Sequence, residues 1–470
     1  MALAALVASA FFMEMLDSTV ILTALPRMAE AFQSDAVHLS VGVTAYLLAL
    51  AVLIPASGWV ADHFGTRRIF LGAIVVFTGA SVLCGLSGNL WQFTAMRVLQ
   101  GVGAAMMSPV GRIALLRVTE KRDLVRSMNI YSMSALAAPV IGPPLGGFIT
   151  TYWSWRWIFF LNLPIGLAGL FFVLRMFPDL RAEKPRPFDF TGFMLNGGAL
   201  VGLLYGMNAF TEGASALHAL PMMAAGVILA VFAFRHARRD EHPLVAFTAL
   251  RVPSFATSVW AGVLFRIALS APTFLLPLLL QLGMGLDAFR AGMLILVHAA
   301  ADMATKALTA PALRRFGFRS VLLWSALAFG LCLFGLGFNT STTPLWLTLV
   351  LLVVSGSARS FHMTALNALQ FSDVPPAQLT AASTLAGMAA QISQAVGVAG
   401  AALVLNGAVW WRGGSTTRLL ATDFRWALVI SALVAVASWI YYAPLSRATG
   451  AHVSGHRTDL ANTAKTAKPD

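Results

Sequence analysis

Charged side chains are scarce in this sequence. Only 11% of the 470 residues are Asp, Glu, Lys or Arg, whereas soluble domains contain about 25%. Hydrophobic residues make up 58% of the chain, and its mean hydropathy is +0.77. Because so little charge cannot cover a water-facing surface, the composition excludes an ordinary soluble globular protein.

Cysteine and the common cofactor motifs are also rare or missing. The two cysteines, Cys84 and Cys332, both lie within apolar runs, so a disulfide framework has no support. The sequence contains no P-loop, Rossmann fingerprint or zinc-ligand spacing. These absences exclude a pump that carries its own ATPase, and they predict neither a cofactor nor a metal. A membrane enzyme would need clustered His or carboxylates at one interface, which we do not find.

Long apolar runs recur along the whole chain. About 20 helical residues cross the hydrocarbon core, and lipid offers no hydrogen-bond partners to open strands. We therefore predict an all-α polytopic membrane protein with fourteen transmembrane helices. The first run has no basic n-region and continues to Leu25, so we interpret it as a span and not as a signal peptide. The expected spans lie near 2–25, 41–61, 69–87, 91–115, 128–150, 157–175, 189–208, 217–234, 255–281, 291–309, 320–338, 345–366, 380–405 and 425–444.

The distribution of Lys and Arg predicts the orientation. The even-numbered connections and the C-terminal tail hold 21 of these cations, and the odd-numbered connections hold 6. Positive loops stay in the cytoplasm, so both termini are expected there, in a bacterial inner membrane. The formal charge of +13 then belongs to the cytoplasmic membrane surface and not to a nucleic-acid site.

An internal repeat divides the chain. "ADHFGTRRIFL" follows the second span and "LRRFGFRSVLL" follows the tenth, and their shared Phe-Gly-x-Arg core places Phe64 against Phe316. Many transporters alternate access around a site between such repeated halves. We predict a six-helix half (1–175), two inserted spans with cytoplasmic loops (176–253), a second six-helix half (254–445) and a disordered cytoplasmic tail (446–470).

The first half buries three ionisable side chains. Arg97 lies inside the fourth span, where an unpaired charge costs at least about 2.5–3.5 kcal/mol. Glu14 and Asp17 are the only acids available to it in the spans of that half, and they share one face of the first span. Two carboxylates so close resist joint ionisation, so one is expected to hold a proton that Arg97 can displace. A static ion pair that fixes helix packing is the alternative.

The second half carries an unusual polar set within its spans. His298, Asp302 and Lys306 are spaced i, i+4, i+8, and Asp302 and Lys306 are predicted to pair. That pairing would leave Arg266 and Arg359 without acidic partners. We predict a substrate or coupling role for these five residues and for His362, which lies with Arg359 in the twelfth span. Arg112, near the cytoplasmic end of the fourth span, is predicted either to join this group or to extend to the membrane surface. Salt bridges between helices, such as Arg266 with Asp302, are the alternative.

Several local motifs occur in order along the chain. They are "LDSTVILTALP" (Leu16–Pro26), "GWVADHFGTRR" (Gly58–Arg68), "RVLQGVGAA" (Arg97–Ala105), "PVIGPPLGG" (Pro139–Gly147) and "WRWIFFLNLPIG" (Trp155–Gly166). Together they resemble the fourteen-span drug:proton antiporter branch of the major facilitator superfamily, and within it the multidrug exporters. The resemblance covers essentially the whole chain. The sequence departs from that pattern at Glu14, an added acid, and at Leu22, where Asn is common.

The resemblance implies roles for these motifs. The loop after the second span would act as a cytoplasmic gate latch, although a plain topology anchor is the alternative. The fifth-span motif would mark an antiporter and act as a hinge or seal, although its glycines also suit close packing. Asp17 and Arg97 match positions tied to proton coupling. The gating residues implied are Gly58, Asp62, Gly65, Arg67, Arg68, Pro139, Gly142, Pro143, Gly146 and Gly147.

The function predicted is proton-coupled efflux of drugs or other amphipathic small molecules, by a secondary active transporter and not an enzyme. The alternative is export of an anionic metabolite or metal-chelate by the same mechanism, suggested by Arg266, Lys306 and Arg359. The expected partners are the lipid bilayer, a small-molecule substrate and protons. The sequence gives no information on a periplasmic adaptor.

Overall fold

The computed structural model describes residues 2–119, 121–181, 187–211, 216–240, 243–245, 247–375, 378–414 and 419–446. Helices are the only regular secondary structure in these ranges, which confirms the all-α class. The predicted tail, apart from its first residue, lies outside the described residues. The helices are α1 (Ala2–Ala31), α2 (Ser40–Phe64), α3 (Thr66–Leu86), α4 (Leu90–Val118), α5 (Lys121–Tyr152), α6 (Trp157–Phe160), α7 (Asn162–Met176), α8 (Phe190–Thr211), α9 (Ala216–Ala237), η1 (Thr248–Arg251), α10 (Pro253–Leu278), η2 (Leu279–Gly283), α11 (Ala288–Leu336), α12 (Leu345–Gln370), α13 (Leu379–Trp411), α14 (Asp423–Ala437) and α15 (Trp439–Tyr442).

The length and apolar composition of these helices are those of a multi-pass membrane protein. Within the described residues, twelve helical stretches are long and apolar enough to cross a bilayer, against the fourteen predicted. One of the twelve, α11, is 49 residues long. At about 1.5 Å per residue this length is roughly twice that of an ordinary span. The backbone of α11 leaves the helical conformation at Gly317.

The repeated Phe-Gly-x-Arg motif makes the same backbone turn in both places. Gly65 joins α2 to α3 with φ 94°, and Gly317 interrupts α11 with φ 73°. Side chains other than glycine rarely adopt this region of φ, so the glycine is required at both turns. The sequence repeat is therefore also a structural repeat.

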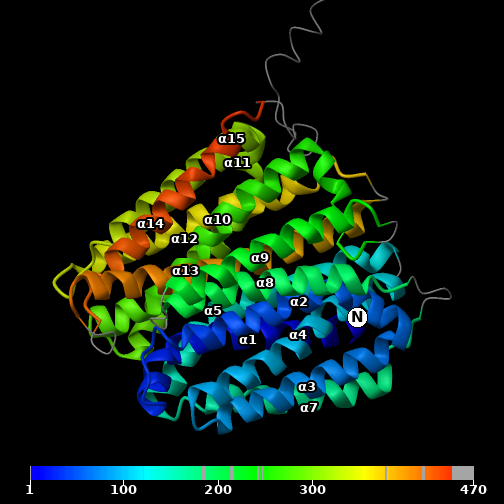
Figure 1. Cartoon of the computed structure of the whole chain (residues 1–470), viewed down its shortest axis with the longest axis horizontal. Helices are drawn as coiled ribbons and strands as arrows, with labels where there is room; N and C mark the ends of the chain where they lie inside the picture. The colour runs from blue at the N-terminus through cyan, green and yellow to red at the C-terminus, as the bar shows by residue number, and fades with distance from the viewer. Residues whose placement is uncertain are drawn as a thin grey trace, which may run out of the picture.

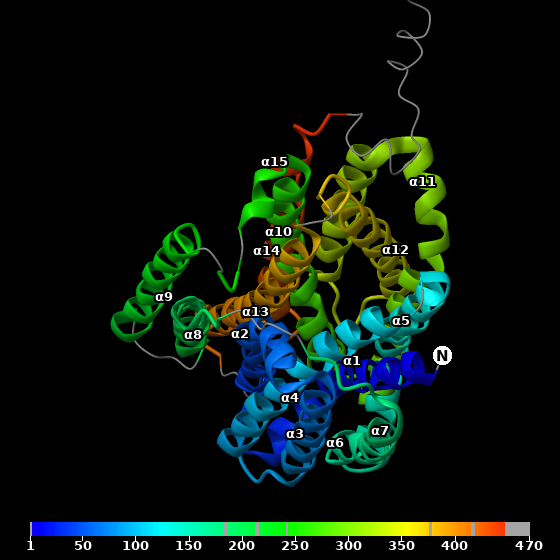
Figure 2. The same cartoon turned by 90° about the vertical axis from the view of Figure 1, so that its right-hand side faces the viewer.

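The helices pack as long rods that lie side by side (Figure 1). Figure 2 shows one bundle of α1–α7 and a second of α10–α15, with α8 and α9 on the outside of the molecule. Helix α8 packs against α9 and contacts α2 and α13, one from each bundle. The two bundles meet mainly where α5 packs on α11 and α2 packs on α13.

Helices α5 and α11 approach each other closely at one end of the molecule. A methyl group at Gly147 of α5 would overlap the backbone carbonyl of Ala288, and one at Gly292 of α11 would overlap that of Pro143. Small residues at such positions let helix backbones meet. The C-terminal part of α5 and the N-terminal part of α11 therefore form a tight seam between the bundles.

Hydrogen bonds join the bundles at this same end. The Phe289 amide donates to the Thr151 hydroxyl (3.1 Å), and the Gln281 side-chain amide donates to the Thr23 carbonyl (3.1 Å). These residues lie in the C-terminal third of α1, at the C-terminal end of α5, within η2 and at the start of α11. We call this end, defined by residues 143–151 and 281–292, the sealed end.

The opposite face of α5 packs on α1. Gly142 lies against Thr19, and Gly146 lies against Thr23 and the Val20 carbonyl, with no room for a Cβ at either glycine. The helix also contains the three prolines at 139, 143 and 144. The fifth-span motif thus places glycines toward both neighbours of α5, toward α1 inside its own bundle and toward α11 across the seam.

The variant Gly147→Ala is expected to open the sealed end without unfolding either bundle, because its methyl group would meet the Ala288 carbonyl across the seam. Overpacking of this kind costs about 1–3 kcal/mol. Hydrogen–deuterium exchange should increase in residues 143–151 and 288–292. The matched control is Gly387→Ala in α13, where nothing lies within 4 Å of an added Cβ. Equal exchange in the two variants would contradict the seam.

Candidate functional site

A buried ion pair lies at the centre of the first bundle. Arg97 of α4 and Asp17 of α1 are 0% and 4% exposed, and Nη1 of the arginine lies 2.6 Å from Oδ2 of the aspartate. The same Nη1 donates to Oε1 of Gln100 (2.7 Å), whose amide donates to Oδ1 of Asp17 (2.8 Å). The Arg97 guanidinium also lies over the Tyr46 ring, 4.3 Å from its centroid. The partner predicted for Arg97 is therefore present, and it is Asp17.

A third helix completes this network. The Asn162 side chain at the start of α7 donates to Oδ1 of Asp17 (2.9 Å) and to the Ser81 hydroxyl (2.9 Å). Ser81 in turn donates to the Phe159 carbonyl (2.9 Å). The sequence prediction missed Asn162 and Ser81. Asn162 lies within the motif Trp155–Gly166, to which no role was assigned, and the signal for Ser81 was its polarity within an apolar span, which many packing residues share.

Glu14 has a separate environment from Asp17. It is 2% exposed, and it accepts a short hydrogen bond from the Ser108 hydroxyl of α4. Tyr131 of α5 lies nearby and stacks on Phe11, with ring centroids 4.7 Å apart. The two carboxylates share a helix face, as predicted, but each has its own partners. Asp17 accepts from charged and amide donors, whereas one hydroxyl donates to Glu14.

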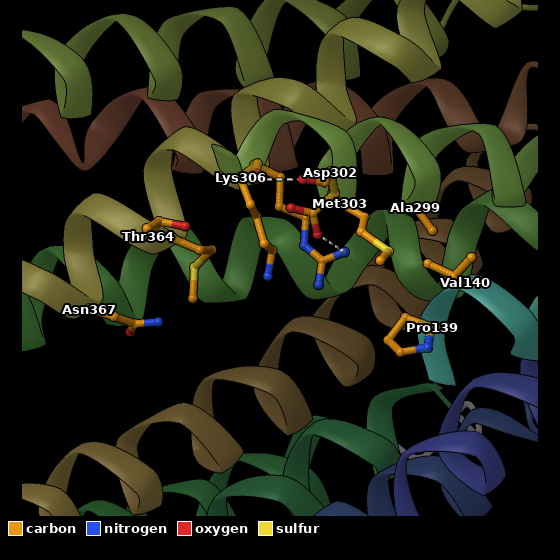
Figure 3. A pocket seen from close by; sticks show the side chains of 11 residues that line it. Pro139, Val140, Ala299, Asp302, Met303, Lys306, Thr364 and Asn367 are labelled. Carbon is orange, nitrogen blue, oxygen red and sulfur yellow. Dashed lines mark hydrogen bonds and ion pairs between the residues drawn. The ribbon is translucent and has the colours of Figure 1, made fainter. Parts of the chain in front are cut away.

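A cavity of about 210 Å³ lies between the two bundles. Figure 3 shows Lys306 and Asn367 directed into it, with Pro139 and Val140 of α5 at its border. It begins just inside the sealed end and continues along α11 and α12. Its lining consists of Pro139, Val140, Ala299, Asp302, Met303, Lys306, Arg359, Ser360, Met363, Thr364 and Asn367.

The ion pairing in this cavity differs from the prediction. The Asp302 carboxylate lies 3.4 Å from Nη1 of Arg359 in α12, and the Asp302 carbonyl accepts from the Ser360 hydroxyl (2.6 Å). Within the described residues, Lys306 forms no ion pair within 4.0 Å. The predicted Asp302–Lys306 pair is therefore wrong. The i,i+4 spacing predicts contacts within one helix only, whereas here Arg359 of the neighbouring helix α12 competes with Lys306 for the Asp302 carboxylate.

Three other predicted substrate residues are not part of the cavity lining, although Arg266 contacts the lining residue Asn367. His298 faces α12, where its Nδ1 lies 2.9 Å from the Ser355 hydroxyl. Arg266 donates to the Asn367 side chain (3.1 Å), so the suggested Arg266–Asp302 bridge is not formed. Arg112 is exposed on α4. Of the predicted set, the structure brings together Asp302, Lys306 and Arg359 around one cavity.

The His362 side chain belongs to a separate buried group. It is 0% exposed and stacks on Phe265, with ring centroids 3.5 Å apart. Its ring nitrogens lie 3.0 Å from the Ser325 hydroxyl and 2.9 Å from the Tyr442 hydroxyl. These contacts join α10, α11, α12 and α15 inside the second bundle.

The loop between α2 and α3 contacts other helices of the first bundle. Asp62 pairs with Arg117 at the end of α4 (2.8 Å), and Arg67 donates to the Leu174 carbonyl of α7. A Cβ at Gly65 would meet Asp179 in the segment after α7. Gly58 has free space around it and Arg68 is exposed. The contacts of Asp62, Gly65 and Arg67 therefore connect the C-terminal ends of α2, α4 and α7.

Asp189 caps the first inserted helix and was missed by the sequence prediction. Its carboxylate accepts from the backbone amides of Gly192 (2.7 Å) and Leu244 (3.0 Å), and Nε2 of His236 lies 2.8 Å from it. Burial opposes ionisation, but these donors outweigh it and hold the pKa of the Asp189 carboxyl below its ordinary value. The contacts tie the start of α8 to the end of α9 and to the segment that leads to α10.

The variant Asp189→Asn should loosen this junction, because an amide oxygen accepts more weakly than a carboxylate and its NH₂ faces two N–H donors. Exchange at 190–193 and 243–245 should rise while α1–α7 stay unchanged. Because the pKa of Asp189 is lower in the folded protein than in the unfolded chain, its ionised carboxylate stabilises the fold at pH values above the unfolded-state pKa. This stabilisation is lost as the pH falls through the pKa of the folded state. The wild type should therefore approach the variant only below about pH 4. Equal exchange in both proteins at pH 7 would contradict this role.

Comparisons with known proteins identify similar chains. The profile described as Major Facilitator Superfamily matches residues 7–398 and, in an overlapping match, 260–467. Proteins named "Putative multidrug resistance protein MdtD" from Escherichia coli O157:H7 and Shigella flexneri are each 34% identical over 404 residues, which is 85% of this chain and 85% of theirs.

Solved transporter structures share the fold. A D-xylose-proton symporter aligns with a TM-score of 0.67 at 14% identity, covering 96% of this chain and 98% of its own. A POT family transporter in complex with 5-aminolevulinic acid aligns with a TM-score of 0.69 at 15% identity, covering 93% and 94%. At these identities the likeness concerns the fold alone.

Proposed function

The chain belongs to the major facilitator superfamily, and we propose that it exports amphipathic small molecules across the bacterial inner membrane in exchange for protons. Membership makes it a multi-pass membrane transporter and not an enzyme. The name of its MdtD relatives supports the drug-like substrate class. The direction of transport and its coupling to protons are part of the proposal.

The proposal includes fourteen crossings in a six, two and six arrangement. Helix α11 would supply two of them, one on each side of Gly317, and α5 would supply one more than the twelve stretches counted above. The halves would be 1–175 and 254–445, joined by the insert 176–253. The outside position of α8 and α9 in Figure 2 agrees with such an insert.

The orientation proposed places both termini in the cytoplasm. The ratio of 21 to 6 cations supports this assignment. The sealed end would then face the periplasm, since α1, α5 and η2 end there and α11 begins there. The cavity would be reached from the cytoplasm, where a substrate for export is collected.

Proton coupling is proposed to depend on the different surroundings of Asp17 and Glu14, and this is the observation that carries the function. Asp17 accepts hydrogen bonds from Arg97, Gln100 and Asn162, and these contacts hold α1, α4 and α7 together. Among the described side chains, the Ser108 hydroxyl is the one that donates a hydrogen bond to Glu14. A carboxyl group that is buried and poorly solvated favours its neutral form, so Glu14 is the group that takes and releases the proton.

The cycle follows from this assignment. With Glu14 protonated, α1 carries no uncompensated charge, and the bundles can close around the cavity. Release of the proton leaves a buried carboxylate, whose cost favours the conformation in which water or Arg112 can reach it. The same carboxyl group would thus take up a proton in one conformation and release it in the other, which couples proton movement to alternating access.

The full-length protein in liposomes loaded with a pH-sensitive dye tests the function. Addition of a transported substrate to acid-loaded vesicles should raise the internal pH, and a protonophore should remove the effect. Vesicles without protein provide the control. Proton movement in the same direction as the substrate would show symport, and substrate equilibration without proton movement would show a facilitator. Either result would contradict the proposal.

A further inference from the structure

Three ionisable side chains line the cavity between the bundles, and their charges do not cancel. Asp302 carries one negative charge, while Lys306 and Arg359 carry two positive ones. Both Asp302 and Lys306 come from α11 and lie beside each other in Figure 3, yet the carboxylate is paired across to Arg359. The cavity therefore has an excess of one positive charge.

The donors of both cations are largely free to bind a ligand. Arg359 is 30% exposed, and its contact with Asp302 at 3.4 Å is longer than a charged hydrogen bond of about 2.7–2.9 Å. No other hydrogen bond or ion pair of Arg359 occurs among the described residues. Lys306 forms no ion pair within 4.0 Å in that part of the chain. An excess charge at membrane depth is costly unless an anion joins it.

The rest of the lining is suited to an apolar body. Met303 and Met363 lie on α11 and α12, and Pro139 and Val140 close the cavity from α5. Methionine adapts to differently shaped apolar groups. The cavity volume of about 210 Å³ limits the ligand to a small molecule.

We propose that this cavity selects amphipathic monoanions, whose carboxylate or sulfonate binds between Lys306 and Arg359 while the apolar part contacts Met303, Met363 and α5. The inference rests on the proposed export function and names its substrate class. Arg359 offers a planar fork to the anion, and Lys306 offers a compact charge. Asp302 is the internal competitor, because a ligand anion that engages Arg359 displaces it.

Binding can be measured without any proton gradient. The full-length protein in phosphatidylcholine nanodiscs is equilibrated with 2-naphthoate or with 2-naphthylmethylammonium, which share a ring system and differ in charge. Naphthoate is expected to bind at least about tenfold more tightly, since a hydrogen bond to a charged group is worth that factor or more. Equal affinities for the two probes would overturn the inference.

Variants locate the binding to the cavity. Lys306→Gln should weaken naphthoate binding about tenfold, and Lys306→Arg should restore most of it. Asp302→Asn removes the competitor and should strengthen binding, a gain that misfolding cannot produce. The control is Arg290→Gln, which removes a cation that is 75% exposed and does not line the cavity. Unchanged affinity in both Lys306→Gln and Asp302→Asn would overturn the assignment.

The anion can be a soluble metabolite or a lipid headgroup, and the membrane composition separates these sources. In nanodiscs that contain phosphatidylglycerol, weaker naphthoate binding that depends on Lys306 supports the site and identifies a lipid competitor. Equal binding in both membranes supports the site with a soluble ligand. Transport assays test the proposed function separately. Proton exchange with cationic drugs but no binding of naphthoate would support the proposed function and overturn this inference. Binding of naphthoate without proton exchange would support this inference and overturn the proposed function.

Discussion

Replacing Glu14 by glutamine is expected to abolish proton-driven accumulation while leaving downhill substrate movement intact. The amide resembles the protonated carboxyl group in shape and charge, and it can still accept from the Ser108 hydroxyl. The protein should therefore fold and bind substrate, but it cannot release a proton. One proton crossing about 100 mV supplies about 2.3 kcal/mol, which is roughly a 50-fold gradient of a neutral substrate. In Glu14→Gln this ratio should fall to about one.

The measurement is the ratio of internal to external substrate in energised vesicles, with counterflow as the downhill assay. Glu30→Gln is the matched control, because Glu30 lies on the same helix but is 67% exposed and pairs with Arg27 on the surface. Counterflow should be equal in all three proteins. Uphill transport by Glu14→Gln, together with its loss on neutralising Asp17 in a folded variant, would assign the proton to Asp17 instead.

The sequence predicted the first-bundle ion pair because its physical rule is strict. An arginine at bilayer depth must have an anionic partner, and only Glu14 and Asp17 were available in the spans of that half. The choice between the two carboxylates could not be made in advance. It depends on Asn162 and Ser108, whose positions relative to α1 follow from the packing of α4 and α7 and not from spacing along the chain.

The second-half site shows where spacing fails. Residues 298, 302 and 306 are spaced one turn apart on α11, but the neighbouring helix α12 gives them different surroundings. His298 packs against Ser355, while Asp302 and Lys306 face the cavity. A helical stripe identifies neighbours on one helix, whereas burial and pairing depend on the next helix. By contrast, the repeated Phe-Gly-x-Arg motif was reliable, because its glycine has a backbone conformation that hardly any other residue adopts.

Neutralising Asp17 is expected mainly to lower the stability of the folded protein. In Asp17→Asn the Arg97 guanidinium stays buried between α1 and α4 with no carboxylate, and the amide presents N–H groups toward donors on Gln100 and Asn162. Breaking a buried pair by removing one partner costs about 3–5 kcal/mol. The variant should unfold at markedly lower denaturant in mixed micelles, followed by tryptophan fluorescence, and it should express poorly.

The double variant Asp17→Asn/Arg97→Gln distinguishes a lost attraction from an uncompensated charge. Removing both charges should recover most of the stability, because the two neutral amides can hydrogen-bond with one another and neither member of the pair is left as an uncompensated ion. The matched pair for comparison is Asp62 with Arg117, whose side chains are 33% and 42% exposed, so Asp62→Asn should cost at most about 1 kcal/mol. If Asp17→Asn costs no more than Asp62→Asn, Arg97 must be reached by water or another anion. Asp17 would then be free to take part in proton exchange, and the division of roles between it and Glu14 would be wrong.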